Sequence, residues 1–361
     1  MKILQMHTSM AGGGIQSIVC ALCNEMVKTQ DVTLCTIYAP QDGDIFDVKL
    51  RNEVKRHNLG KKKTGISVGS LFKVYTFIKK GKYDVVHIHG FFYYYIFAVF
   101  LLYRKVKFFY TIHSDAKFEN TTWDNRLIKL KKFAFIKRMI HPITISQVSQ
   151  ESFLNYYGFG GNLIFNSIPR PSIEEVDLLK EFRVSHDTRL FVHPGRITEA
   201  KNQVVLCQAF KRLIDAGYDA CLIIAGSRQD EQIYTEIEKY FCKRIIYVGE
   251  QENIPQILYN ADAMCLSSIW EGLPVTLLEA LSVGCIPICT PVGGIVNIIE
   301  HGRNGFLSED TSADKYYEVL QKFMNISDDA LNLMQQNCKS TFLSYDISKA
   351  SSEHLKLYES I

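Results

Sequence analysis

Two glutamates, Glu271 and Glu279, stand eight positions apart in the stretch EGLPVTLLE, with a proline and an otherwise apolar run between them. Pro274 suits the first turn of a helix, where its missing N–H costs nothing, and Gly284 suits the C-terminal end. The stretch therefore predicts a helix over 274–283. Glu271 would precede this helix, and Glu279 would lie more than one turn inside it.

These two carboxylates are candidates for binding hydroxyl groups. A charged side chain inside an apolar helix is costly to bury without a partner, and the hydroxyls of a ribose or a sugar are good partners. The N-terminal end of the helix adds main-chain amides from Leu273 and Val275. We interpret Glu271 and Glu279 as two hydroxyl clamps in one site. The alternative is a solvated surface glutamate and a second one paired with a neighbouring cation.

Two cations, Arg196 and Lys201, stand five positions apart in the segment HPGRITEAKN, between a predicted strand and a predicted helix. An arginine can bind two phosphate oxygens at once, a lysine supplies a point charge, and a helix N-terminus favours an anion. Together these features predict a diphosphate site. A solvated basic loop is the alternative, but the position directly after the first strand of a domain favours phosphate.

A glycine-rich segment, AGGGIQS at 11–17, follows the first predicted strand. The main-chain N–H groups of its three consecutive glycines can approach a phosphate or a polar sugar closely, and the following helix offers its positive end. The dinucleotide fingerprint G-x-G-x-x-G is incomplete, because Ser17 stands where its third glycine would be. This disfavours an NAD enzyme. A purely structural tight turn is the other alternative.

Strand-like and helix-like segments alternate along the whole chain, and this predicts parallel sheets. The predicted strands lie at 2–7, 32–38, 85–89, 107–113, 143–146, 162–166, 189–194, 220–225, 244–248, 263–267 and 286–290. A segment with two prolines and a charged run separates the two halves. We predict an α/β protein with two doubly wound, Rossmann-like domains at 1–168 and 169–340, facing each other across a cleft. A C-terminal helix within 341–361 would pack back on the first domain.

The composition is that of a globular protein, since 47% of the 361 residues are hydrophobic and 22% are charged. Its charge is unevenly distributed. Residues 1–165 carry 23 Lys and Arg against 11 Asp and Glu, whereas the remainder carries 18 against 27. This asymmetry indicates two domains with different partners. The ten cysteines show no zinc-site spacing, so we expect no metal and a reducing, cytoplasmic compartment.

No segment is predicted to cross a membrane, because the longest apolar stretch, 91–103, would span only ~20 Å of a ~30 Å hydrocarbon core. Cations at 61–63 and throughout 126–139, the latter beside Phe133, Phe135 and Ile136, nevertheless form a basic amphipathic pattern. Such a pattern predicts peripheral contact with an anionic membrane surface, here the inner face of the plasma membrane. A buried helix with a solvated basic face is the alternative. No nucleic-acid partner is expected.

The stretch EGLPVTLLE, followed by ALSVGCIPICTPVGGIVNIIEHGRNGFL, and the motif GRITEAK at 195–201 resemble the retaining glycosyltransferases of family 4, which have the GT-B fold. The GGIQS loop resembles the phosphatidylinositol mannosyltransferase and polysaccharide-biosynthesis branch. The resemblance spans nearly the whole chain and is most specific over 189–308. It implies transfer of a sugar, with retained anomeric configuration and without metal or cofactor. The donor would be a nucleotide-sugar, by default a UDP-sugar, and the acceptor a saccharide or a lipid-linked acceptor in capsule or lipopolysaccharide synthesis.

The resemblance also implies a role for each candidate residue. Arg196 and Lys201 match the pair that neutralises the diphosphate leaving group, and Glu279 matches the ribose clamp. Glu271, with Gly272 and the adjacent helix N-terminus, matches the position that holds the hydroxyls of the transferred sugar.

In the N-terminal half, Gly13 and Gly14 match the loop against the distal phosphate. His113, in TIHSD at the end of a strand, matches a histidine that contacts the donor sugar. The chain departs from the family pattern at Asn297, where a glutamate often follows VGG, and in the segment NSIP at 166–169. A GT-B nucleotide-sugar epimerase and a non-catalytic sugar- or membrane-binding protein are the alternative functions.

Overall fold

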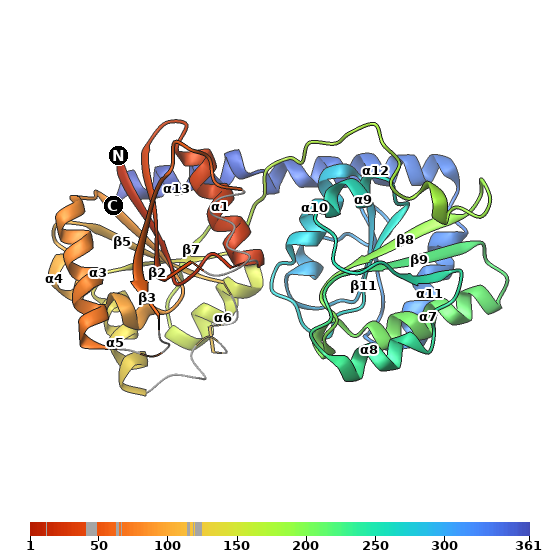
Figure 1. The fold of residues 1–361 in the computed structure, drawn as a ribbon, viewed down its shortest axis with the longest axis horizontal. Coiled ribbons are helices and arrows are strands. Elements are labelled where there is room, and N and C mark those ends of the chain that lie inside the picture. The colour runs from red at the N-terminus through yellow and green to blue at the C-terminus, as the bar shows by residue number, and fades with distance from the viewer. Residues whose placement is uncertain are drawn as a thin grey trace. The chain divides into compact units, whose positions relative to one another are not determined.

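The computed structural model describes residues 1–11, 13–40, 49–62, 65, 67–113, 116–117, 119 and 125–361. The chain forms two compact units, one made of Met1–Pro169 and Asp346–Ile361 and the other of Arg170–Tyr345 (Figure 1). The predicted limit between the domains, 168/169, lies one residue before the observed one. The preceding helix α12 (Asp328–Phe342) belongs to the second unit, and the chain returns to the first unit from Asp346 onward.

The first unit contains a seven-stranded parallel sheet in the order β3-β2-β1-β4-β5-β6-β7. Its strands are β1 (Lys2–His7), β2 (Asp31–Tyr38), β3 (Lys55–Lys61), β4 (Val85–His89), β5 (Lys107–Ile112), β6 (His141–Thr144) and β7 (Asn162–Leu163). The sequence predicts all of these except β3. This edge strand, KRHNLGK, is mostly exposed and carries no apolar alternation that could reveal it.

Helices cover both faces of this sheet. They are α1 (Gly14–Met26), α3 (Val68–Gly81), α4 (Ile96–Leu102), α5 (Asn125–Ile136), α6 (Gln147–Tyr157) and α13 (Ile347–Ser360). Successive side chains of β1 point to opposite faces. Leu4 and Met6 therefore pack in the cluster that includes residues of α3 to α6, whereas Ile3 packs in the cluster of α1 and α13. Tyr358 of α13 packs against Phe109 of β5, with 4.7 Å between the ring centres.

The second unit contains a six-stranded parallel sheet in the order β10-β9-β8-β11-β12-β13. Its strands are β8 (Arg189–Pro194), β9 (Ala220–Ala225), β10 (Ile245–Tyr247), β11 (Ala263–Leu266), β12 (Ile286–Cys289) and β13 (Phe306–Leu307). Its helices are α7 (Gln203–Asp215), α8 (Glu231–Glu238), α9 (Ile254–Tyr259), α10 (Val275–Val283), α11 (Ala313–Met324) and α12. The predicted doubly wound parallel sheets are thus confirmed.

One prediction about α10 needs correction. Pro274 caps this helix in an extended conformation, with φ −69° and ψ 127°, and the helix itself begins at Val275. The prediction for the other end was right: Gly284 terminates the helix with φ 84°, in the left-handed region that glycine adopts without strain.

Both sheets reverse their strand order beside their first strand. Two neighbours flank β1, namely β2 and β4, and two flank β8, namely β9 and β11. Ligands of such sheets bind at this switch point, outside the carboxyl ends of the strands. The loops that follow β1, β4, β8 and β11 are therefore the places where functional side chains are expected.

Candidate functional site

In the second unit, the loops that follow β8 and β11 are joined by an ion pair. Lys201 Nζ donates to Glu271 Oε1 at 2.5 Å, and the two side chains are only 20% and 10% exposed. Ser268 Oγ donates to the same oxygen at 2.7 Å. Because both bonds go to Oε1, the second oxygen, Oε2, can accept hydrogen bonds from a ligand.

Main-chain bonds fix the same two loops to each other. The N–H of Ile269 donates to the carbonyl oxygen of Ala200 at 2.9 Å. Ser267 Oγ donates to the carbonyl oxygen of Lys201 at 2.9 Å. The position of Lys201 beside Glu271 thus follows from the backbone at the switch point as well as from the ion pair.

Arg196 is exposed on the loop after β8, and a buried relay holds its main chain. Gln203 Nε2 donates to the carbonyl oxygen of Arg196 at 2.8 Å and lies 3.1 Å from His193 Nε2. His193 Nδ1 lies 2.9 Å from the carbonyl oxygen of Cys265. A carbonyl only accepts, so Nδ1 carries the hydrogen and Nε2 is the acceptor. Burial lowers the pKa of His193 to about 4, which keeps this relay neutral.

Glycines of two further loops lie in close backbone contact with the loops after β8 and β11. A Cβ atom at Gly226, after β9, would overlap the carbonyl oxygen of Gly195, and one at Gly293, after β12, would overlap that of Glu271. Gly293 also has φ 55°. The N–H of Gly294 donates to the carbonyl oxygen of Gly272 at 2.7 Å. Only residues without a side chain allow such close approach of the backbones.

The remaining predicted residues of this unit lie at the start of α10. Leu273 is buried, while Gly272 and Val275 are half-buried. The first amides of a helix have no acceptor within the helix, so this end of α10 offers N–H groups to a ligand. Glu279 lies further along α10 and is also half-buried. The structure thus joins Lys201 directly to Glu271 and places Arg196 and Glu279 on the same two switch-point connections.

In the first unit, the predicted glycines lie where β1 leads into α1. Gly13 is the residue before the helix and Gly14 is its first residue, and the carbonyl oxygen of Gly13 accepts from the N–H of Ser17 at 3.0 Å. Gly12 lies outside the described residues, as do Ser114 and Asp115 of the TIHSD motif.

His113 follows β5 and ends a hydrogen-bonded chain. His113 Nε2 lies 3.0 Å from His89 Nδ1, and His89 Nε2 lies 2.8 Å from Gln5 Oε1. The other end of the Gln5 amide, Nε2, faces the sulfur of Met26 at 3.6 Å, and a thioether accepts but does not donate. This orientation makes Gln5 Oε1 the acceptor, so the hydrogens lie on Nε2 of both histidines.

The chain of hydrogen bonds leaves His113 Nδ1 as a bare acceptor. It is buried, and the described residues provide no partner for it. Burial lowers the pKa of His113 to about 3, so the ring is neutral and Nδ1 can accept a hydrogen bond from a hydroxyl but cannot donate one. Gln5 and His89 are not among the residues predicted from the sequence. Their positions on β1 and at the end of β4, the switch-point strands, were the available signal.

Among the described residues, no group of three or more His, Cys, Asp or Glu side chains is arranged to hold a metal ion. Cys20 and Cys23 are buried and unpaired, as expected for small core residues. Within the same part of the chain, no helix combines the length and the apolar character needed to cross a bilayer.

Comparison with known proteins identifies the family. Residues 12–166 match the family Glycosyltransferase Family 4, and residues 177–340 match the family Glycosyl transferases group 1. The chain belongs to the family 4 glycosyltransferases. The predicted family is confirmed, and the phosphatidylinositol mannosyltransferase branch stays a prediction.

Two curated relatives of this glycosyltransferase have named activities. An Escherichia coli enzyme named UDP-Gal:alpha-D-GlcNAc-diphosphoundecaprenol alpha-1,3-galactosyltransferase is 26% identical over 75% of this chain and 73% of its own length. A Campylobacter jejuni enzyme is 24% identical over 99% of this chain and 98% of its own. Its name is GalNAc-alpha-(1->4)-GalNAc-alpha-(1->3)-diNAcBac-PP-undecaprenol alpha-1,4-N-acetyl-D-galactosaminyltransferase.

Solved structures show the same fold. Anabaena HepE, solved with UDP and glucose, superimposes with a TM-score of 0.81 at 16% identity, and all of both chains is covered. A glycosyltransferase from Rickettsia africae superimposes with a TM-score of 0.80, also at 16% identity, over 99% of this chain and 98% of the other. The glycosyltransferase therefore has the predicted GT-B fold.

Proposed function

We propose that this glycosyltransferase moves a sugar from a UDP-sugar to a hydroxyl of a saccharide carried on a lipid diphosphate, with retention of the anomeric configuration. The names of the Escherichia coli and Campylobacter jejuni relatives, which contain diphosphoundecaprenol and PP-undecaprenol, support the acceptor. The UDP in the Anabaena structure supports the nucleotide. The product would enter a cell-surface polysaccharide. The observation that carries the proposal is the Lys201–Glu271 pair at the switch point of the second unit.

In this proposal Arg196 and Lys201 bind the diphosphate. Cleavage of a glycosyl–phosphate bond places negative charge on the leaving phosphate and positive charge on the sugar ring. Cations and helix amides that are already in position stabilise this charge without reorganisation. Arg196 is exposed on a loop whose main chain is held by Gln203, so its guanidinium is available to a ligand.

The two glutamates then take different parts of the donor. One carboxylate oxygen of Glu271 already accepts hydrogen bonds from Lys201 and Ser268, so Oε2 would accept hydrogen bonds from the hydroxyls of the transferred sugar. Glu279 would accept hydrogen bonds from the ribose hydroxyls. The roles of Gly13, Gly14 and His113 toward the donor stay predictions, and the bare Nδ1 of His113 has the acceptor chemistry that a sugar hydroxyl needs.

We also propose that the protein is cytoplasmic and contacts an anionic membrane surface through α5. Lys129 and Lys132 are exposed on this helix, together with Phe133 and Ile136, and Lys137 is exposed directly after it. Two residues of the predicted pattern point inward and are excluded from the contact. Lys131 is buried against Glu119 at 2.9 Å, and Phe135 is buried in the core. Lys63 of the other basic segment lies outside the described residues.

A titration with UDP, GDP and ADP and their sugars, followed by thermal shift and calorimetry, tests the donor site. We expect Arg196→Ala and Lys201→Ala each to weaken UDP binding about tenfold or more, because a hydrogen bond to a charged group contributes roughly 1.5–3 kcal/mol. Glu279→Ala should weaken it as well. The matched control is Lys239→Ala. It removes an exposed cation at the C-terminal end of α8.

Two results would reject the proposal. If UDP affinity were unchanged in both Arg196→Ala and Lys201→Ala, these two residues would not bind the diphosphate. Turnover of the UDP-sugar into an epimer without any acceptor would establish the epimerase instead. Transfer is expected to persist in EDTA, since we propose that it uses no bound metal or cofactor.

A further inference from the structure

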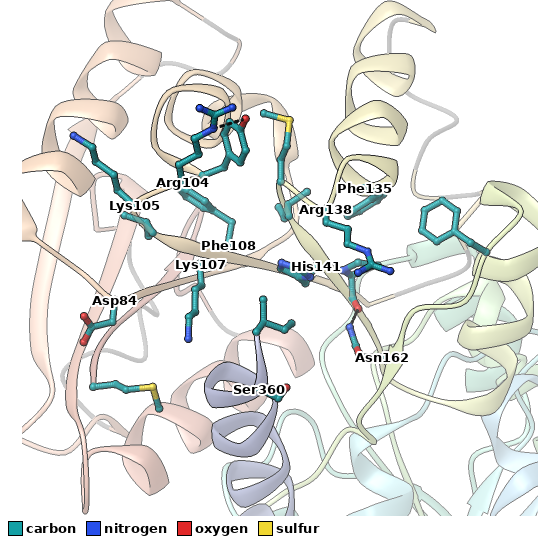
Figure 2. Close-up of a pocket in the computed structure, with 18 of the residues that line it drawn as sticks. Asp84, Arg104, Lys105, Lys107, Phe108, Phe135, Arg138, His141, Asn162 and Ser360 are labelled. Atoms are coloured by element: carbon teal, nitrogen blue, oxygen red, sulfur yellow. Dashed lines mark hydrogen bonds between the residues drawn. The ribbon is translucent and has the colours of Figure 1, made fainter.

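A hollow of about 1120 Å³ opens at the amino ends of the strands in the first unit. It lies where β5 begins at Lys107 and β6 begins at His141, with Asp84 just before β4 (Figure 2). The candidate residues of this unit, such as His113, follow the carboxyl ends of the strands. The hollow therefore lies at the opposite ends of the same strands, away from His113 and from Gly13 and Gly14.

The hollow is strongly basic. In Figure 2 Arg104 and Lys105 lie on one side of it and Arg138 on the other, with Lys107 between them. The one acidic side chain in its lining, Asp84, accepts from the main-chain N–H of Lys2 at 2.7 Å. Counted over its side chains, the lining has four cations and one carboxylate, and such a surface attracts anions.

Two of these cations are available to a ligand. The part of the chain that the structure describes offers no hydrogen-bond or ion-pair partner to the exposed side chains of Lys105 and Arg138. Lys107 Nζ donates to the carbonyl oxygen of Tyr358 at 2.9 Å, and Arg104 Nε donates to the hydroxyl of Tyr103 at 3.1 Å. Arg138 also has φ 52°, a left-handed backbone conformation that favours glycine, yet the position carries a long cation.

Exposed apolar side chains lie near the ends of the two helices that precede the cations of the hollow. Helices α4 and α5 lie side by side, since the rings of Phe100 and Phe133 stack with 6.2 Å between their centres. Both helices end at the hollow, α4 next to Arg104 and α5 next to Arg138. Near these ends Leu101 is 64% exposed, Ile136 is 56% exposed and Phe133 is 46% exposed. Apolar groups of this size beside lysines are typical of a surface that enters a lipid interface.

We propose that this hollow binds the phosphate head groups of an anionic bilayer, while Leu101, Phe133 and Ile136 enter the interface. The proposal rests on the membrane contact proposed above and gives it a site. A dissolved phosphate would use the cations alone, and the exposed apolar side chains beside them would have no role. A bilayer uses both, because its head groups supply the negative charge and its acyl boundary accepts the apolar groups.

The test is flotation of the full chain with vesicles of phosphatidylglycerol and phosphatidylcholine, or of phosphatidylcholine alone, at low salt. The hollow variant combines Arg104→Gln, Lys105→Gln and Arg138→Gly, and glycine suits the left-handed backbone at 138. Each cation near an anionic surface is worth about fivefold in binding, so we expect a loss on the order of 100-fold. A control variant with Lys211→Gln, Lys239→Gln and Lys243→Gln loses the same charge from exposed positions of the second unit and should still bind.

A second variant, Phe133→Ser with Ile136→Ser, keeps every cation and should also lose vesicle binding. If the hollow variant bound vesicles as well as the wild type, or if the hollow and control variants lost vesicle binding equally, the hollow would not be the membrane site. If pyrophosphate bound the hollow and the protein did not bind vesicles, the ligand of the hollow would be a dissolved anion, and the proposed membrane contact would be wrong. UDP affinity, measured on every variant, reports separately on the proposed function. Wild-type protein that binds vesicles but no nucleotide would reject the proposed function and leave the hollow intact.

Discussion

The ion pair between Lys201 and Glu271 is the central residue-scale feature of the donor site. The carboxylate neutralises the cation before any ligand binds, and the pair is mostly shielded from solvent. A nucleoside diphosphate must therefore share Lys201 with Glu271. Lys201, assigned to phosphate, and Glu271, assigned to sugar, are coupled through this ion pair. A substitution of either residue therefore also changes the other.

We predict that Glu271→Gln separates binding from turnover. The variant keeps the shape of the side chain and removes the charge that competes for Lys201, so UDP affinity should be unchanged or higher. Turnover should fall on the order of 100-fold, because the acceptor for the sugar hydroxyls is weakened in the transition state. Calorimetry with UDP and steady-state transfer assays measure the two effects. A loss of UDP affinity as large as that of Lys201→Ala would contradict this view of the pair.

The sequence identified both members of the pair but not their contact. Residue type and local spacing indicated a cation before one helix and a carboxylate before another. The two positions are 70 residues apart, and they meet only because β8 and β11 are neighbours in the sheet. Strand order is a property of the folded chain, so no local pattern could predict it. The same reason explains why His89, which bonds His113, and Gln5, which bonds His89, were not found.

At the scale of elements, the sequence predicted the strands that have an apolar pattern, including the short β7, and missed the exposed β3 and the two-residue β13. The strand β13 has only two residues and is defined by its pairing with β12, in which Ile288 faces Phe306. The start of α10 was predicted one residue early, because proline is accepted both as the first helical residue and as the cap. The end of α10 was predicted correctly from Gly284, whereas the close contacts that Gly293 and Gly294 make with the loop after β11 were not predicted.

We predict that Gly226→Ala displaces the loop that carries Arg196. The added Cβ would overlap the carbonyl oxygen of Gly195, which is backbone and cannot rotate away. We expect a loss of roughly 1–3 kcal/mol in the free energy of unfolding and weaker UDP binding. Gly69→Ala is the control, because a Cβ at this position on α3 meets no atom within 4 Å and alanine favours helix. Urea denaturation and UDP titration of both variants measure the effects, and equal stabilities would contradict the expected clash.

At the scale of the whole molecule, the two units differ in charge and in their buried histidines. The alternation of strands and helices was enough to predict two parallel sheets. The charge asymmetry predicts that the two halves have different partners, and this stays a prediction. In the structure the basic hollow lies in the first unit. Among its described residues, the first unit also contains six histidines whose pKa is lowered by burial, namely His7, His87, His89, His113, His141 and His354.

We predict that this cluster makes the first unit the acid-labile one. The pKa of a histidine in the unfolded chain is near 6.5, whereas burial lowers it to about 3 for His113 and about 4 for His354. Below pH 6.5 the unfolded chain binds protons that the native rings do not, so stability is complete above this pH and falls as the pH decreases toward 4. Each such histidine contributes a slope of up to about 1.4 kcal/mol per pH unit.

Hydrogen exchange at pH 7.5, 6 and 5, corrected for the intrinsic exchange rate, measures this difference directly. Protection in β1, β4 and β5 should fall before protection in β8 and β11, because the second unit has a single comparable histidine, His193. His354→Gln removes one titrating ring and should reduce the pH dependence of the first unit by up to one proton, whatever its effect on stability at pH 7.5. If both units lost protection together on acidification, the buried histidines would not be the cause, and a general loss of carboxylate ion pairs would explain the acid sensitivity better.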